Sequence, residues 1–140
     1  LKVYIGQFIK GKKYSEFKSL KKIRNIKAEV YGWGCFIKAK PQRKDMELAK
    51  KGIARAKKII SEKKYELVIL DEINIALHYN LIKLKDALDL IKQTPKSTEL
   101  ILTGRRAHPK ILKLADLVSE IKEIKHYFKK GIKARRGIEY

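Results

Sequence analysis

Residues 67–72, with the sequence LVILDE, form a continuous apolar run that ends in two adjacent carboxylates. A strand that is apolar at every position has to be covered on both faces, as the central strands of parallel sheets are. Ligands of such sheets bind beyond the carboxyl ends of the strands. The run therefore predicts a central parallel strand that places Asp71 and Glu72 at the mouth of a site.

Strand-like and helix-like segments alternate along the rest of the chain. β-Branched and aromatic residues predict further strands at 2–9, 28–33, 99–103 and 117–124. Apolar positions at helical spacing predict helices at 14–23, 45–64, 73–79, 84–91 and 109–115. The alternation predicts a single α/β domain over residues 1–140, with a mostly parallel sheet sandwiched by helices. Paired acids after a buried strand are typical of the magnesium-holding element of phosphate-loop nucleotide enzymes, so we expect a nucleotide-binding domain.

A phosphate loop of the form G-x-x-x-x-G-K-[ST] would complement the acid pair. Residues 6–13, GQFIKGKK, match this form at every place except the last, where Lys13 replaces the hydroxyl residue that ligates magnesium. The QFI segment also has the composition of a strand. We therefore interpret residues 6–13 as a strand end followed by a basic turn.

The chain begins at Leu1, and its first strand follows at once. A complete nucleotide-binding domain would place an earlier strand, a phosphate loop and a helix, together about 30 residues, before this point. We therefore expect the domain to be N-terminally incomplete, with its first strand and phosphate loop missing from the 140 residues.

The net charge of +20 attracts phosphate polyanions, so a basic nucleic-acid-binding module is one alternative function. The Lys and Arg residues punctuate nearly every segment instead of clustering, which favours solvated helix faces and a general attraction for a nucleotide. No stretch approaches the roughly 18 apolar residues of a membrane helix, and the first residues do not resemble a signal peptide. We expect a cytoplasmic protein without a membrane partner.

Five segments together resemble the ATP:corrinoid adenosyltransferases of the bacterial and archaeal cobalamin pathway. They are QFIKG at 7–11, GWGCF at 32–36, LVILDE at 67–72, LTGR at 102–105 and KHYFKKGIKARRGIEY at 125–140. The last segment is the most specific, because KH, an aromatic residue, GIKA and GIEY follow one another at fixed offsets. The resemblance covers almost the whole chain and implies a RecA-like α/β sheet, of the phosphate-loop nucleotide-hydrolase type, in a homodimer.

The resemblance implies transfer of the 5′-deoxyadenosyl group of ATP to the cobalt of a reduced corrinoid, with Mg²⁺ as cofactor and triphosphate as product. Such a reaction belongs to cobalamin biosynthesis or salvage. Cobalt(I) is itself a strong nucleophile, so the protein needs no nucleophile of its own and acts by positioning and electrostatics. A different phosphate-loop ATPase or kinase shares the acid pair and is the second alternative.

The resemblance also assigns roles to individual residues at the acid pair and in the loop after the second strand. Glu72 is the expected Mg²⁺ ligand, with Asp71 ligating directly or through water, unless one of the two caps the following helix. Trp33 and Phe36 stand where family members carry aromatic residues against the lower face of the corrin. Core packing is the alternative for both, and Cys35 departs from the aromatic pattern.

Phosphate or nucleotide contacts are expected from six further residues. They are Thr103, Gly104, Arg105, Lys10, Lys12 and His126. The first three follow a strand, where a backbone turn and a guanidinium meet phosphate oxygens. The lysines add attraction, and the histidine lies in the C-terminal segment that resembles the family. The alternatives are solvated arginine and lysine side chains and a structural histidine.

Overall fold

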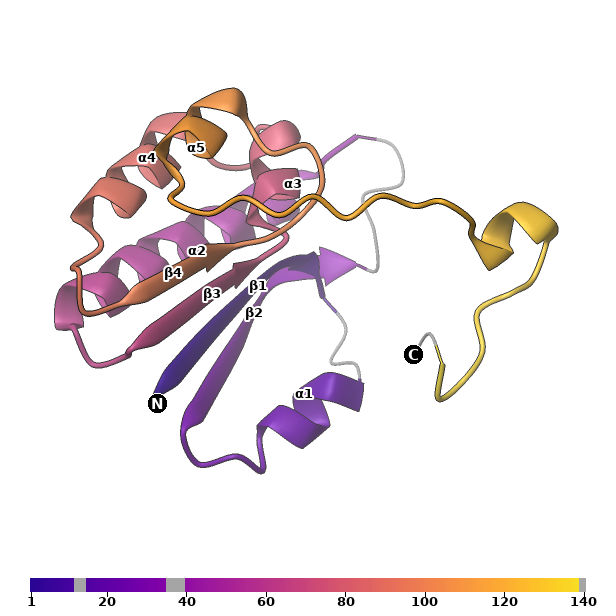
Figure 1. Ribbon diagram of the computed structural model, residues 1–140, viewed down its shortest axis with the longest axis horizontal. Coiled ribbons are helices and arrows are strands. Elements are labelled where there is room, and N and C mark those ends of the chain that lie inside the picture. The colour runs from indigo at the N-terminus through magenta and orange to yellow at the C-terminus, as the bar shows by residue number, and fades with distance from the viewer. Residues whose placement is uncertain (12–14, 35–39, 139–140) are drawn as a thin grey trace.

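The computed structural model describes residues 1–11, 15–34 and 40–138. These residues contain a four-stranded sheet in the order β2-β1-β3-β4, and every pairing in it is parallel (Figure 1). The strands are β1 (Val3–Lys10), β2 (Ile26–Gly34), β3 (Leu67–Asp71) and β4 (Glu99–Leu102). The predicted parallel α/β sheet is confirmed, with β3 in an interior position and all carboxyl ends at one edge.

Helices follow the strands in chain order. They are α1 (Ser15–Leu20), α2 (Arg43–Glu62), α3 (Ile73–His78), α4 (Leu84–Gln93), α5 (Pro109–Leu114) and a C-terminal 3₁₀ helix, η1 (Tyr127–Lys130). Helices α2 to α5 group together on one side of the sheet, whereas α1 lies apart from them beside β2 (Figure 1). None of the described helices is long and apolar enough to cross a membrane.

The core lies between the sheet and α2. Tyr4 and Phe8 of β1 and Leu70 of β3 are fully buried, and α2 presents the predicted apolar stripe toward them. The stripe consists of Ala49, Ile53, Ala56 and Ile60. Helix α2 approaches closely at Gly52, where an added Cβ would lie 2.8 Å from ring atoms of Phe8 and Tyr31. Close packing of a glycine against two aromatic rings fixes the height of α2 above the strands.

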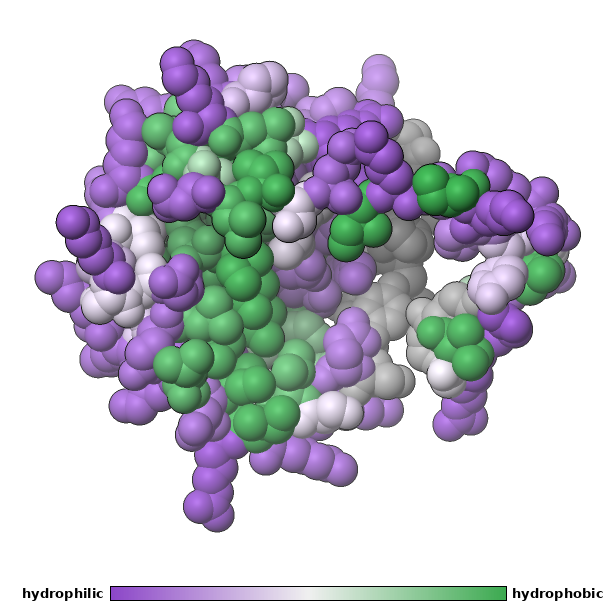
Figure 2. Space-filling view, viewed as in Figure 1, coloured by the Kyte–Doolittle hydropathy of each residue, from purple (hydrophilic) through white to green (hydrophobic). Residues whose placement is uncertain are grey.

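The second face of the sheet is covered less completely. Helix α1 packs there against β2, through the buried Phe17. Ile5 and Ile69 on the neighbouring strands are only half-buried, and Ile101 of β4 is exposed. Figure 2 shows the result as a band of apolar surface that runs across the sheet.

One predicted element is absent from the part of the chain that the structure describes. Residues 117–124 adopt no regular secondary structure, and Leu117 and Ile121 are 84% and 98% exposed. The prediction of a strand at 117–124 is wrong because a strand requires a hydrogen-bonding partner strand as well as strand-forming residues. This segment pairs with no described strand and leads into the C-terminal stretch that extends away from the sheet (Figure 1).

A polar cluster that is half-buried ties β1, β2 and α2 together. The Glu29 carboxylate accepts hydrogen bonds from the hydroxyls of Tyr31 and Tyr4, the latter at 2.8 Å, and from the Arg55 guanidinium at 3.2 Å. Lys27 adds an ion pair at 3.3 Å. Burial alone would raise the pKa of Glu29, but these donors lower it to about 2. Burial and the hydrogen bonds within the cluster raise the pKa of the Tyr4 hydroxyl, which keeps it a donor.

The lowered pKa of Glu29 makes the free energy of unfolding depend on pH in the acid range. Its pKa is below the ordinary 4.5 in the folded chain, so its contribution is complete above pH 4.5 and disappears as the pH falls toward 2. We expect Glu29→Gln to lower the free energy of unfolding at neutral pH by about 2–3 kcal/mol and to flatten its pH dependence in that window. Urea titrations at a series of pH values measure both effects.

The control for this experiment is Glu47→Gln. Glu47 pairs with Arg43 one turn away on α2, but both side chains are largely exposed. Such a pair contributes at most about 0.5 kcal/mol. An equal loss of stability in the two variants would show that the cluster is no stronger than a surface ion pair.

Candidate functional site

The candidate site is the carboxyl edge of the sheet, where β3 ends in Asp71. The Asp71 side chain is fixed on both sides: one carboxylate oxygen accepts a hydrogen bond from Gln7 Nε2 at 3.0 Å and the other from Thr103 Oγ1 at 2.7 Å. Gln7 belongs to β1, and Thr103 follows β4. The two neighbours of the central strand therefore orient its terminal carboxylate.

Thr103 joins the ends of β3 and β4 through backbone and side chain together. Its amide donates to the Leu70 carbonyl at 3.1 Å, which extends the ladder by one residue. Its hydroxyl also accepts a hydrogen bond from the Glu72 amide at 3.0 Å, and its carbonyl accepts one from the Asn74 amide at 3.2 Å. Thr103 thus sets the position of both acids and of the start of α3.

Glu72 occupies the turn between β3 and α3 in a left-handed conformation, with φ of 60°. It is the N-cap residue of α3, yet its side chain makes no capping hydrogen bond, so the helix-cap alternative is not what the structure shows for Glu72. Gly104, with φ of 116°, packs against it, and an added Cβ would lie 3.1 Å from Glu72 Oε2. No described residue donates a hydrogen bond to the Glu72 carboxylate, which therefore keeps its capacity to bind a cation.

Two buried amides that the sequence analysis missed complete the edge. Gln7 and Asn74 are each 5% exposed, and their side-chain nitrogens donate to Asp71 and to the Gly104 carbonyl. Their oxygens, Gln7 Oε1 and Asn74 Oδ1, accept no hydrogen bond within the described part of the chain. A buried acceptor without a donor costs about 1–3 kcal/mol, so these oxygens favour a bound donor or cation. The available signal was a polar residue within an apolar segment, VYIGQFI or EINIAL.

The chemistry of this edge suits Mg²⁺. The donors that the structure brings together are oxygens: two carboxylates, a threonine hydroxyl and an amide oxygen. Mg²⁺ is usually held by one or two carboxylates, with substrate phosphates and water as its other ligands. No cluster of three or more His, Cys, Asp or Glu side chains suited to a metal occurs among the described residues.

Of the other residues predicted for the site, some lie at the same edge of the sheet and some lie outside the described residues. Lys10 ends β1 beside Gly34 at the same edge, and Arg105 follows Gly104 with an exposed side chain. Lys12 and Phe36 lie outside the described residues. The structure therefore unites Asp71, Glu72, Thr103 and Gly104. Lys10 ends β1 at the same edge, and Arg105 adjoins Gly104 in the sequence.

Trp33 and His126 lie in different surroundings from the acid pair. Trp33 is near the end of β2 and 57% exposed, and Lys44 Nζ lies 3.0 Å from the centroid of its ring, so core packing does not account for Trp33. His126 caps η1, with its Nδ1 accepting a hydrogen bond from the Phe128 amide at 3.0 Å. Its exposed C-terminal stretch lies away from the sheet, and the structure does not bring it to the acidic edge (Figure 1).

A parallel sheet with oriented acids beyond its carboxyl edge defines an α/β domain of the type that binds nucleotides and similar ligands there. The particular family follows from sequence comparison: residues 1–140 match the family model described as ATP:corrinoid adenosyltransferase BtuR/CobO/CobP, and the chain belongs to this family. The resemblance found in the sequence is confirmed over the whole chain.

Characterised relatives carry the same designation. A corrinoid adenosyltransferase from Sinorhizobium sp. is 36% identical over 140 residues, which cover 97% of this chain and 65% of that protein. Corrinoid adenosyltransferases from Pseudomonas aeruginosa and Escherichia coli K12 are 32% and 30% identical, over 100% and 99% of this chain and 70% and 71% of those proteins. The chain spans about two thirds of the length of these relatives.

The role of Thr103 leads to a test of how the edge is held together. We expect Thr103→Val to lower the free energy of unfolding by about 1–3 kcal/mol, because the Glu72 amide loses its acceptor and Asp71 loses a donor. Thermal and urea unfolding measure the loss. The matched control is Thr94→Val, which removes one hydroxyl bond to a carbonyl on the same helix and should cost less. Equal losses would contradict a joining role for Thr103.

Proposed function

We propose that this chain carries the Mg²⁺–triphosphate part of an adenosyltransferase site that transfers the 5′-deoxyadenosyl group of ATP to the cobalt of a reduced corrinoid. The observation that carries the proposal is the acid pair of the family-matched domain, with Asp71 fixed by two hydrogen bonds and Glu72 left free beside it. The relatives are named corrinoid adenosyltransferases, which supports ATP and a corrinoid as the substrates.

The two acids have different tasks in this proposal. Glu72 ligates Mg²⁺ directly, because its carboxylate is unengaged, and Asp71 ligates it directly or through water while remaining oriented by Gln7 and Thr103. Bound Mg²⁺ would offset the charge that accumulates on triphosphate as it leaves. Arg105, Lys10 and Lys12 add positive charge beside the same phosphates. Catalysis is then positioning and electrostatic stabilisation, without a protein nucleophile.

We propose that Trp33 and Phe36 contact the corrin. The exposed indole of Trp33 supports this assignment, since an aromatic side chain that is 57% exposed is available to a flat apolar ligand. We also propose that His126 approaches the nucleotide only when the C-terminal stretch closes over the edge. We place the reaction in cobalamin biosynthesis or salvage in the cytoplasm, and the enzyme in a homodimer.

Binding of triphosphate at this site would also require the contacts that a phosphate loop provides. Residues 6–10 lie within β1, so the first five residues of the phosphate-loop-like motif GQFIKGKK form a strand. This agrees with the strand part of the interpretation given above, whereas residues 12 and 13 of the expected basic turn lie outside the described residues. We propose that residues outside 1–140 supply the phosphate loop, and the following test compares both forms of the chain.

The direct test is adenosylation of reduced corrinoid, followed by the change in corrinoid absorbance and by identification of the phosphate product. We expect triphosphate as product, and we expect the 140-residue chain to be far less active than a form extended upstream in its gene. In the active form, Glu72→Gln should lower activity by about 100-fold or more, because a neutral amide replaces a charged metal ligand. Raised Mg²⁺ concentrations should restore part of the loss.

The control is Glu66→Gln, since Glu66 lies at the opposite end of the same strand, where its carboxylate accepts a hydrogen bond from the Lys2 amide. It should retain activity. ADP and inorganic phosphate as products would instead identify a different ATPase or kinase. Full activity of Glu72→Gln would exclude Glu72 as the metal ligand.

Trp33 offers an independent test of corrinoid binding, because it is the single tryptophan of the chain. We expect a corrinoid to quench its fluorescence on binding, and Trp33→Leu to weaken corrinoid binding by about 5–10-fold without changing the affinity for Mg²⁺–ATP. Equilibrium dialysis measures corrinoid binding in the variant. A Lys44→Gln control removes the cation over the ring and leaves the indole in place. Unchanged corrinoid affinity in Trp33→Leu would contradict the contact.

A further inference from the structure

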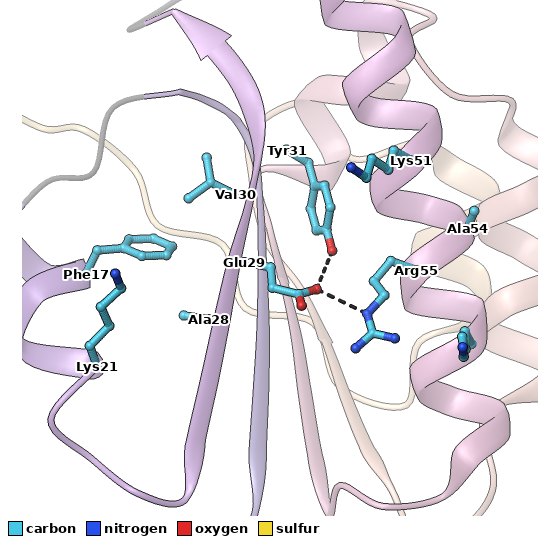
Figure 3. Close-up of a pocket in the computed structure, with 10 residues that line it drawn as sticks. Phe17, Lys21, Ala28, Glu29, Val30, Tyr31, Lys51, Ala54 and Arg55 are labelled. Carbon is cyan, nitrogen blue, oxygen red and sulfur yellow. Dashed lines mark hydrogen bonds and ion pairs between the residues drawn. The ribbon is translucent and has the colours of Figure 1, made fainter.

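Among the described residues, the outer edge of β2 is an unpaired strand edge that lies between two helices. A cavity of about 780 Å³ runs along it, with α1 on one side and α2 on the other (Figure 3). β2 is the terminal strand of the sheet, and no described strand pairs with its outer edge. This cavity lies apart from the acid pair, and the proposed reaction makes no use of it.

The backbone register identifies which groups face the cavity. The Asn25 carbonyl accepts a hydrogen bond from the Val3 amide and so points toward β1, whereas the Ile26 amide bonds to the Ile23 carbonyl in the preceding turn. Successive residues of a strand direct their backbone groups to alternate edges. The amides and carbonyls of Ala28 and Val30 therefore point outward, and both residues line the cavity. They present donors and acceptors that an added strand would satisfy.

The two sides of the open edge differ in chemistry. On the α1 side lie the apolar side chains of Phe17, Ala28 and Val30, together with one cation, Lys21, next to Phe17 (Figure 3). On the α2 side, Lys51, Arg55 and Lys58 follow one another along the helix. A strand bound to β2 would direct alternate side chains to these two sides.

The charge on the α2 side is only partly neutralised. Arg55 is paired with Glu29, and Lys58 lies 3.9 Å from Glu62. Lys51 has no ion-pair partner among the described residues, and neither has Lys21, which lines the cavity from α1. A second copy of this chain would bring the same cations against them. An acidic partner would offset them, so charge complementarity selects the occupant.

We propose that the outer edge of β2 binds an extended acidic segment of a partner protein, in which acidic and apolar residues alternate. The segment adds a fifth strand through the backbone of Ala28 and Val30. Its acidic side chains face Lys51 and Lys58, and its apolar side chains pack beside Phe17 and Val30.

The test uses a fluorescent peptide of about six residues in which glutamate and valine alternate. Fluorescence anisotropy at about 0.1 M ionic strength measures its binding to the 140-residue chain. We expect Lys51→Glu to weaken binding by about 5–10-fold, while Lys50→Glu, its neighbour on α2 that does not line the cavity, leaves binding unchanged. A peptide with the same composition in two blocks, EEEVVV, should bind at least about 10-fold more weakly, because it cannot match both sides.

Backbone pairing is tested by N-methylation, which removes amide donors without changing charge. Of two peptides methylated on alternate residues, one should bind normally and the other at least about 10-fold more weakly, because only one set of amides faces β2. Amide hydrogen exchange at Ala28 and Val30 should slow when the unmodified peptide binds.

Three results would overturn the proposal. The first is equal binding of both methylated peptides or of the block peptide, which indicates charge attraction alone. The second is binding of an oligonucleotide that Lys51→Glu weakens, if the peptide itself does not bind. The third is a dimer, detected by sedimentation, that forms through the β2 edge and that the peptide does not displace. None of these measurements depends on adenosyl transfer.

Discussion

Parallel pairing of β3 with both β1 and β4 is the interaction on which the candidate site depends. Because the three strands run in the same direction, Gln7, Asp71 and Thr103 reach the same edge and bond to one another there. An antiparallel neighbour would bring the other end of its strand to this edge. The orientation of the acids is therefore a consequence of the sheet topology. Thr103 fixes their positions through its hydrogen bonds to the Asp71 carboxylate and the Glu72 amide.

Several elements of the fold follow from local sequence alone. The apolar run at Leu67–Asp71 and the stripe on α2 predict a strand and a helix from their residue patterns, and both elements are found. Residues 117–124 show the limit of such inference, since a strand exists only with a partner. Composition records the tendency to form a strand, but the partner is a property of the whole sheet.

The same limit applies to the site. The sequence predicts that Asp71, Glu72, Thr103 and Gly104 share one edge because they end or follow strands, and strand ends are visible in the sequence. Gln7 and Asn74 were missed because their role depends on burial and on which strands are neighbours. The roles assigned to Trp33, Phe36 and His126 rest on the family resemblance. These residues belong to segments whose positions the sheet does not determine.

The basic charge of the chain has more than one structural role. Part of it is paired within the fold, since Arg55 and Lys27 stabilise the half-buried Glu29 carboxylate and the Arg55 pair joins α2 to β2. Part of it lies at the carboxyl edge of the sheet, where Lys10 ends β1 and Arg105 follows Gly104 after β4. Lys21 and Lys51 belong to neither group, and they flank an open strand edge. A net charge of +20 alone would suggest a nucleic-acid surface, whereas these six cations belong to three separate places on the fold.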